Sequence, residues 1–195
     1  MKEIKFGIFG EDEAHQIFLQ NYFKNFKNEN ISFNVHEDFY PKIENFTGAK
    51  KKVFKNLDTV AKKAYSSYYL ELLIVVIDCD KNDFTEESTR LSDILDPLIR
   101  NDHGKSYILC IPVRCIEHWF LYLTDKKLKD NSIETLSGPD AKKLIYGHPR
   151  FNKKTDSPKV ENLSKTFPIK ELIIKSKSFL KFHTDVEKFC KNQVA

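Results

Sequence analysis

Short apolar runs alternate along the chain with longer amphipathic stretches. Four apolar runs read as strands, at residues 2–9, 31–35, 72–77 and 106–113. The stretches between them carry apolar residues at helical spacing, at residues 14–26, 51–69 and 86–100. Strands that alternate with helices are typical of a mainly parallel sheet covered by helices. The predicted fold class is therefore α/β, with a mainly parallel central sheet of about four strands flanked by helices.

The run from Leu72 to Ile77 is predicted to be the central strand. It holds six consecutive apolar residues, four of them β-branched, as suits a strand buried on both faces. Asp78 and Asp80 follow it directly, and ligands of open α/β sheets bind at the carboxyl ends of the strands. We therefore expect a polar site at these two aspartates. The alternative is an ordinary strand end, because aspartate commonly opens turns.

Acidic residues also follow the first predicted strand. Glu11, Asp12 and Glu13 come directly after Gly10. Asp12 is expected to cap the next helix, and acids in a first helical turn suit the helix dipole.

The rest of the chain is less regular. We expect a loop at 39–48, a helix that begins near Glu117, loops with short helices at 125–170, and a helical tail at 170–190. One of the short helices is expected near 140–146. No repeat or linker interrupts the chain, which predicts a single domain over 1–195, with a core at 1–124 and a loop-rich and helical C-terminal extension at 125–195.

Composition narrows the class of protein. With 195 residues, 41% hydrophobic and 13% aromatic, the chain suits an ordered globular protein. Its opening residues lack the apolar stretch of a secretory signal, and no apolar run approaches the roughly 20 residues that span a bilayer. The four cysteines include no CxxC pair, so we interpret them as reduced core thiols. These features predict a cytoplasmic protein without a membrane partner.

A net charge of +4 permits binding to nucleic acid without requiring it. Clusters of cations at two places in the chain could contact phosphate, whereas the alternative is an ordinary solvated surface. The predicted nucleic-acid-binding residues are Lys50, Lys51, Lys52, Lys142, Lys143 and Arg150.

The acids after the first strand and the Asp-x-Asp after a later buried strand resemble the Toprim (topoisomerase–primase) domain. In that family a glutamate after the first strand and the two aspartates hold a divalent metal for phosphoryl transfer on nucleic acid. Asp78 and Asp80 match the Asp-x-Asp. The family's first motif is Glu-Gly-x-x-Glu, and aligning its glycine with Gly10 matches Glu13 but places Phe9 where the first glutamate belongs. Glu11, one residue later, is the alternative.

Further fragments resemble small stand-alone Toprim-like proteins of unknown function, relatives of the overcoming-lysogenisation-defect nucleases and of bacterial phage-defence effectors. The fragments lie at 117–121, 140–144 and 178–182, so that the resemblance covers about residues 4–190. It implies a divalent-metal-dependent nuclease that hydrolyses DNA or RNA, acting in phage defence or as a toxin-like effector. Relatives often act with a separate ATPase, and this chain has no GxxxxGK[ST] loop of its own.

The resemblance also assigns roles to residues. The predicted catalytic residues are Glu11, Asp78, Asp80 and Glu117, and the predicted ligands of Mg²⁺ or Mn²⁺ are Glu11, Glu13, Asp78, Asp80 and Asp83. His15 is a candidate general base, His118 is expected on the surface or satisfied by a neighbour, and Trp119 is expected in the core. The alternative function is a catalytically degenerate Toprim-fold module that binds a protein partner or nucleic acid.

Overall fold

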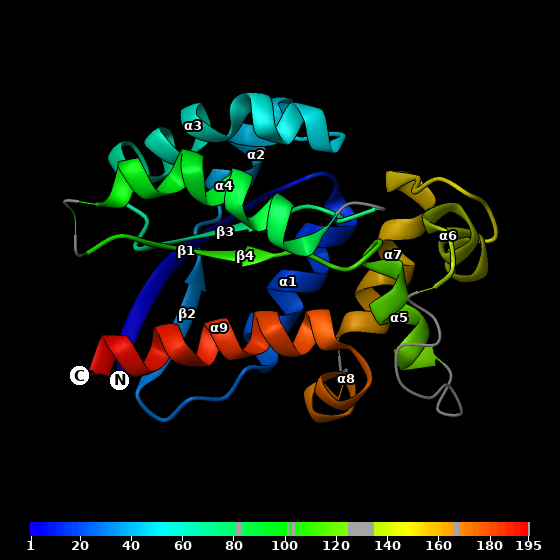
Figure 1. The fold of residues 1–195 in the computed structure, drawn as a ribbon. Coiled ribbons are helices and arrows are strands. Elements are labelled where there is room, and N and C mark those ends of the chain that lie inside the picture. The colour runs from blue at the N-terminus through cyan, green and yellow to red at the C-terminus, as the bar shows by residue number, and fades with distance from the viewer. Residues whose placement is uncertain (81–82, 101, 103, 125–134, 166–167, 195) are drawn as a thin grey trace.

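A four-stranded, all-parallel sheet organises the protein (Figure 1). The computed structural model describes residues 1–80, 83–100, 102, 104–124, 135–165 and 168–194. The strands are β1 (Lys2–Gly10), β2 (Ile31–Val35), β3 (Leu72–Val76) and β4 (Ser106–Cys110), in the spatial order β2-β1-β3-β4. The predicted α/β class, the parallel sheet and the strand count are confirmed.

The two faces of the sheet carry separate hydrophobic cores because successive strand residues point to opposite sides. In β3, Leu72, Ile74 and Val76 join one core, while Leu73 and Val75 join the other. Every residue of β3 is buried, as the uninterrupted apolar run predicts.

Helices cover both faces (Figure 1). One face is covered by α1 (Glu13–Asn25) and α9 (Lys177–Val194), and the other by α2 (Phe39–Ile43), α3 (Lys50–Ser66) and α4 (Phe84–Ile99). The expectation of a loop at 39–48 is wrong in part, because this stretch contains α2 and a 3₁₀ turn at Glu44–Phe46. Phe39 and Ile43 are buried in the core between the sheet and α3. Tertiary packing therefore stabilises a helix that is too short to persist alone.

The C-terminal region is helical, with α5 (Glu117–Thr124), α6 (Gly138–Tyr146), α7 (Lys153–Ser164), α8 (Ile169–Lys175) and α9. The expectation of loops with only short helices is wrong at α7, which runs for 12 residues and includes Pro158. Asn152 caps this helix, and Ser164 near its end receives a hydrogen bond from Asn21 of α1 at 2.9 Å. Residues 125–134 lie outside the described chain.

Trp119 joins the C-terminal region to the sheet. Its side chain is fully buried, as expected, and its indole N–H donates to Ser178 Oγ at 3.1 Å. Its ring lies 5.1 Å from that of Phe179 and 5.4 Å from that of Phe18, measured between centroids. The C-terminal extension therefore completes a core of the sheet. Within the described residues, no helix has the length and apolar character needed to cross a membrane.

Candidate functional site

The candidate site lies where β1, β3 and β4 end. Gly10 pairs with Val76, and Val76 pairs with Cys110, so the residues that follow these strands emerge side by side. A Cβ atom at Gly10 would lie 2.3 Å from Val76 Cγ1 and 2.7 Å from its carbonyl oxygen. Glycine at this position therefore lets the end of β1 approach β3 closely, and it delivers Glu11 to the residues after β3.

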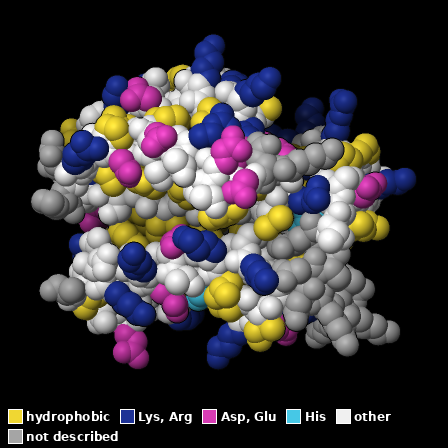
Figure 2. Space-filling model, in the orientation of Figure 1, with side chains coloured by type: hydrophobic (Ala, Val, Ile, Leu, Met, Phe, Trp, Pro, Cys, Tyr) yellow, Lys and Arg dark blue, Asp and Glu magenta, His cyan; other side chains and the backbone are white. Residues whose placement is uncertain are grey.

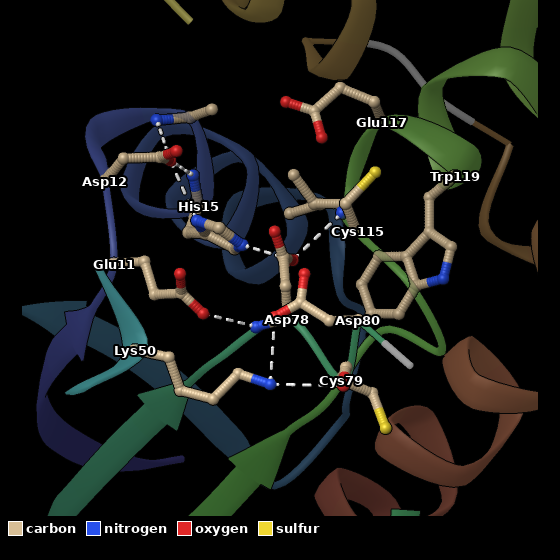
Figure 3. A network of polar contacts seen from close by, with 12 residues as sticks. Glu11, Asp12, His15, Lys50, Asp78, Cys79, Asp80, Cys115, Glu117 and Trp119 are labelled. Carbon is tan, nitrogen blue, oxygen red and sulfur yellow. Dashed lines mark hydrogen bonds and ion pairs between the residues drawn. The ribbon is translucent and has the colours of Figure 1, made fainter. Parts of the chain in front are cut away.

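Glu11 is the glutamate that reaches the aspartates (Figure 3). Its Oε1 accepts a hydrogen bond from the Asp78 backbone N–H at 2.7 Å. Burial, and then the charge of Asp78, raise the pKa of Glu11 to about 7. Glu13 is instead ion-paired, with its Oε2 3.3 Å from Lys153 Nζ. Of the two candidates for the first-motif acid, the structure brings Glu11 to Asp78.

His15 holds Asp78 in place. Its Nε2 lies 2.9 Å from Asp78 Oδ1, and its Nδ1 lies 2.8 Å from Asp12 Oδ1. Burial by itself would lower the pKa of His15, but Asp12 and Asp78 together raise it well above its ordinary value. Burial by itself would raise the pKa of Asp12, but the neighbouring His15 overcomes that effect and lowers it to about 2.

The interpretation of His15 as a general base does not fit this geometry. The side chain is buried, and both of its ring nitrogens are occupied by carboxylates. It has no nitrogen left to take a proton from a substrate. His15 is a positioning residue that fixes the Asp78 carboxylate, which also accepts the Ile116 N–H at 3.1 Å.

Asp80 lies on the turn after β3 with a left-handed backbone, φ 58°. Its Oδ2 is 3.0 Å from Lys50 Nζ, and the same ammonium group contacts the Cys79 carbonyl oxygen and Glu87 Oε1, each at 3.1 Å. Lys50 was predicted to bind nucleic acid, but its side chain is only 14% exposed and its charge is used to hold this turn.

Asp83 has a local role. Its Oδ1 accepts the backbone N–H groups of Thr85 at 2.6 Å and Glu86 at 3.2 Å, so it caps α4. In the structure this predicted metal ligand is therefore the N-cap of a helix.

Glu117 is fully buried near the site. Its Oε1 accepts a hydrogen bond from Tyr146 at 3.0 Å, and its Oε2 has no hydrogen-bond partner in the described chain. Burial raises the pKa of Glu117, and the nearby Lys142 ammonium opposes that change without cancelling it. Lys142 in turn has its pKa raised, against the effect of its own burial, by Glu117, Asp78 and Asp12.

The other predicted nucleic-acid contacts are exposed. Lys51 and Lys52 lie in the first turn of α3, and Lys143 and Arg150 lie on or just after α6. Figure 1 shows both places on the side of the sheet where the strands end. The two clusters therefore flank the acidic site.

The donor chemistry of the site suits a hard divalent cation. Each carboxylate uses one oxygen in the contacts above, namely Glu11 Oε1, Asp78 Oδ1 and Asp80 Oδ2. Among described residues the second oxygen of each makes no hydrogen bond or ion pair. Burial, and then repulsion from Asp78, already raise the pKa of Glu11. As placed, however, no three His, Cys, Asp or Glu side chains of the described chain converge into a metal-holding group.

Two features of the site escaped sequence reasoning. Asp12 and His15 stand at the i, i+3 spacing of a helix start, a signal that could have paired them. Glu87 lies in the first turn of α4, where the helix dipole already accounts for an acid, so only the packing of α3 against α4 reveals its contact with Lys50.

Comparisons of the chain with models of protein families, with curated proteins and with solved structures found no match. Fold and site together define an α/β protein with an acidic cluster at the carboxyl ends of a parallel sheet.

Proposed function

We propose that this protein is a divalent-metal-dependent nuclease of the Toprim type, which hydrolyses phosphodiester bonds of DNA or RNA. The observation that carries the proposal is the contact of Glu11 with Asp78 across the ends of the neighbouring strands β1 and β3. This places an acid after the first strand beside the Asp-x-Asp, in the chain order that the resemblance implies.

In this proposal Glu11, Asp78 and Asp80 hold Mg²⁺ or Mn²⁺. The metal would supply electrostatic stabilisation to the oxygens of the phosphodiester. His15 and Lys50 hold the two aspartates through ion pairs of 2.9 and 3.0 Å, which limits the rearrangement needed for binding. Because the pKa of Glu11 is about 7, this side chain is protonated in a fraction of the molecules at neutral pH and would have to lose that proton to hold a cation.

The biological setting is proposed on the same basis, as phage defence or a toxin-like activity in the cytoplasm. The four cysteines support a reducing compartment, because all are buried and the described chain has no disulfide. A separate ATPase partner stays a prediction that the structure does not address.

One observation favours the alternative of a catalytically degenerate module. The described acids do not converge as a three-ligand group. Metal affinity therefore separates the two functions more directly than a cleavage assay, which could fail merely because a partner is missing.

The test is a calorimetric titration of Mn²⁺ into the wild type and into Asp78→Ala/Asp80→Ala. A matched control, Asp58→Ala/Asp93→Ala, removes two carboxylates that lie on α3 and α4 away from the site. The proposal expects Mn²⁺ to bind the wild type and the control but not the site variant. If the wild type and the site variant bind Mn²⁺ equally, or neither binds it, the nuclease proposal is contradicted and the alternative of a binding module remains.

A further inference from the structure

A pocket of about 520 Å³ between α3 and α4 is lined by four cationic residues and one phenylalanine. Its lining residues are Lys50, Lys51, Phe54, Lys55 and Arg90. We propose that this pocket binds the phosphate backbone of a nucleic acid strand. Lys55 and Arg90 thereby join a phosphate-binding surface that sequence reasoning restricted to Lys50–Lys52 in this region.

The cations of this pocket stand where the rules of helix stability disfavour them. Lys50, Lys51 and Lys52 occupy the first turn of α3, which contains no acid, and Ala49 provides no side-chain cap. The positive end of the helix dipole repels cations there. Lys51 and Lys55 are also four residues apart, a spacing at which like charges repel. Local violations of this kind are expected at functional sites.

A single buried acid compensates part of this charge. Glu87 is fully buried, with Oε1 3.1 Å from Lys50 Nζ and Oε2 3.1 Å from Arg90 Nη1. Arg90 is further held over the Phe54 ring, with its guanidinium carbon 4.3 Å from the ring centre. Glu87, which lies outside the lining of the pocket, therefore holds Lys50 and Arg90 in place, and the Phe54 ring supports Arg90 further.

The other two cations are exposed. The side chains of Lys51 and Lys55 make no hydrogen bond or ion pair with the described residues. Positive charge that is concentrated in a pocket and lacks an internal counter-ion suits an anionic ligand, and lysine and arginine contact phosphate oxygens without reading the base. The ligand class is therefore a phosphodiester strand of any sequence.

Lys50 connects this pocket with the acidic site. It lines the pocket, and its ammonium group contacts Asp80 at 3.0 Å. A strand seated in the pocket therefore passes next to Asp80. Its placement beside a hydrolytic centre rests on the proposed function, whereas phosphate binding by the pocket does not.

The test measures binding of a fluorescein-labelled 12-nucleotide oligothymidylate by anisotropy, in EDTA and over a series of KCl concentrations. Lys51→Gln/Lys55→Gln is compared with Lys62→Gln/Lys63→Gln, which removes the same charge from the other end of α3. The pocket variant should bind about tenfold more weakly, and the slope of log K against log[KCl] should flatten by about 1.4, or about 0.7 for each of two phosphates. The control should keep the wild-type slope.

Equal affinity and slope in the two variants, or no binding by the wild type, overturns the proposal. Sodium pyrophosphate tests the other source of phosphate, because pyrophosphate that binds where the oligonucleotide does not overturns a strand site. If the wild type binds the oligonucleotide but binds no Mn²⁺, or binds Mn²⁺ no better than Asp78→Ala/Asp80→Ala does, the nuclease proposal alone is overturned. The two proposals can therefore fail separately.

Discussion

At the scale of single residues, some carboxylates of the acidic site contact a histidine and one has no cationic partner among the described residues. Asp12 and Asp78 share the His15 ring, which offsets their burial. Glu11 has one backbone hydrogen bond, but burial, and then the negative charge of Asp78, raise its pKa to about 7. When it is ionised, Glu11 therefore reduces the stability of the fold.

Glu11→Gln is expected to stabilise the metal-free protein at pH 8 and to leave it unchanged at pH 4.5. The pKa of Glu11 is higher in the folded state, at about 7, than its ordinary value of 4.5, so the folded state binds the proton more tightly. Wild-type stability therefore falls as pH rises between these values, whereas neutral glutamine loses nothing. After allowance for partial exposure we expect a gain of about 2 kcal/mol, or about 5 °C in Tm.

Thermal unfolding in EDTA, followed by circular dichroism at both pH values, checks this prediction. The control is Glu29→Gln, an exposed substitution away from the site. A gain for Glu11→Gln that is the same at both pH values contradicts the assignment.

At the scale of elements, two helices that begin beside the site follow opposite rules. Helix α1 begins with Asp12 as its cap, accepting the Ala14 N–H at 3.0 Å, and has Glu13 in its first turn. Helix α3 begins with three lysines and no capping side chain. The first start favours stability, and the second is consistent with an anionic ligand.

Lys51→Glu is therefore expected to raise the stability of the protein by about 0.5–1 kcal/mol, because it removes a cation from the positive end of α3. It also places glutamate four residues before Lys55, the favourable orientation for an ion pair. The matched substitution Lys62→Glu should lower stability, since it breaks the 2.8 Å ion pair with Asp58 near the other end of α3. Urea unfolding of both variants measures the two signs, and a shift in the same direction contradicts this account.

At the scale of the whole molecule, the C-terminal helices belong to the core of the sheet. Figure 1 shows α9 lying along the face of the sheet opposite α3 and α4, with the two chain ends close together. Lys2 Nζ donates to Gln193 Oε1 at 2.6 Å, which ties the ends directly. Figure 2 shows hydrophobic side chains at the floor of a hollow that crosses the drawn face, with Lys and Arg side chains along its lower side.

Phe179→Ala is expected to reduce the free energy of unfolding by about 3–5 kcal/mol, because it opens a cavity beside Trp119 and Phe18. Phe179→Leu should lose less, about 1.5 kcal/mol, since it keeps more of the volume. Unfolding followed by Trp119 fluorescence and by far-ultraviolet circular dichroism should share one midpoint in both variants. Separate midpoints would show that residues 125–195 unfold independently of the sheet.

By itself, the sequence determined the features that depend on neighbours along the chain. Apolar periodicity located all four strands and helices α1, α3 and α4, and Asp12 was recognisable as a cap. The edge that holds the candidate site followed as well, because parallel strands end at one edge of their sheet. Short α2 and Pro-containing α7 were missed, since burial against distant residues overrides their weak local signals.

Only the tertiary structure decided which charges meet. The register that pairs Gly10 with Val76 brings Glu11 into contact with Asp78. Glu13 instead pairs with Lys153, which lies 140 positions further along the chain. The partnership of Lys50 with Asp80 and Glu87 likewise depends on the packing of α3 against α4 at the end of β3. Coulombic and hydrogen-bond energies depend on separation in space, and the register and packing that set those separations are properties of the folded chain.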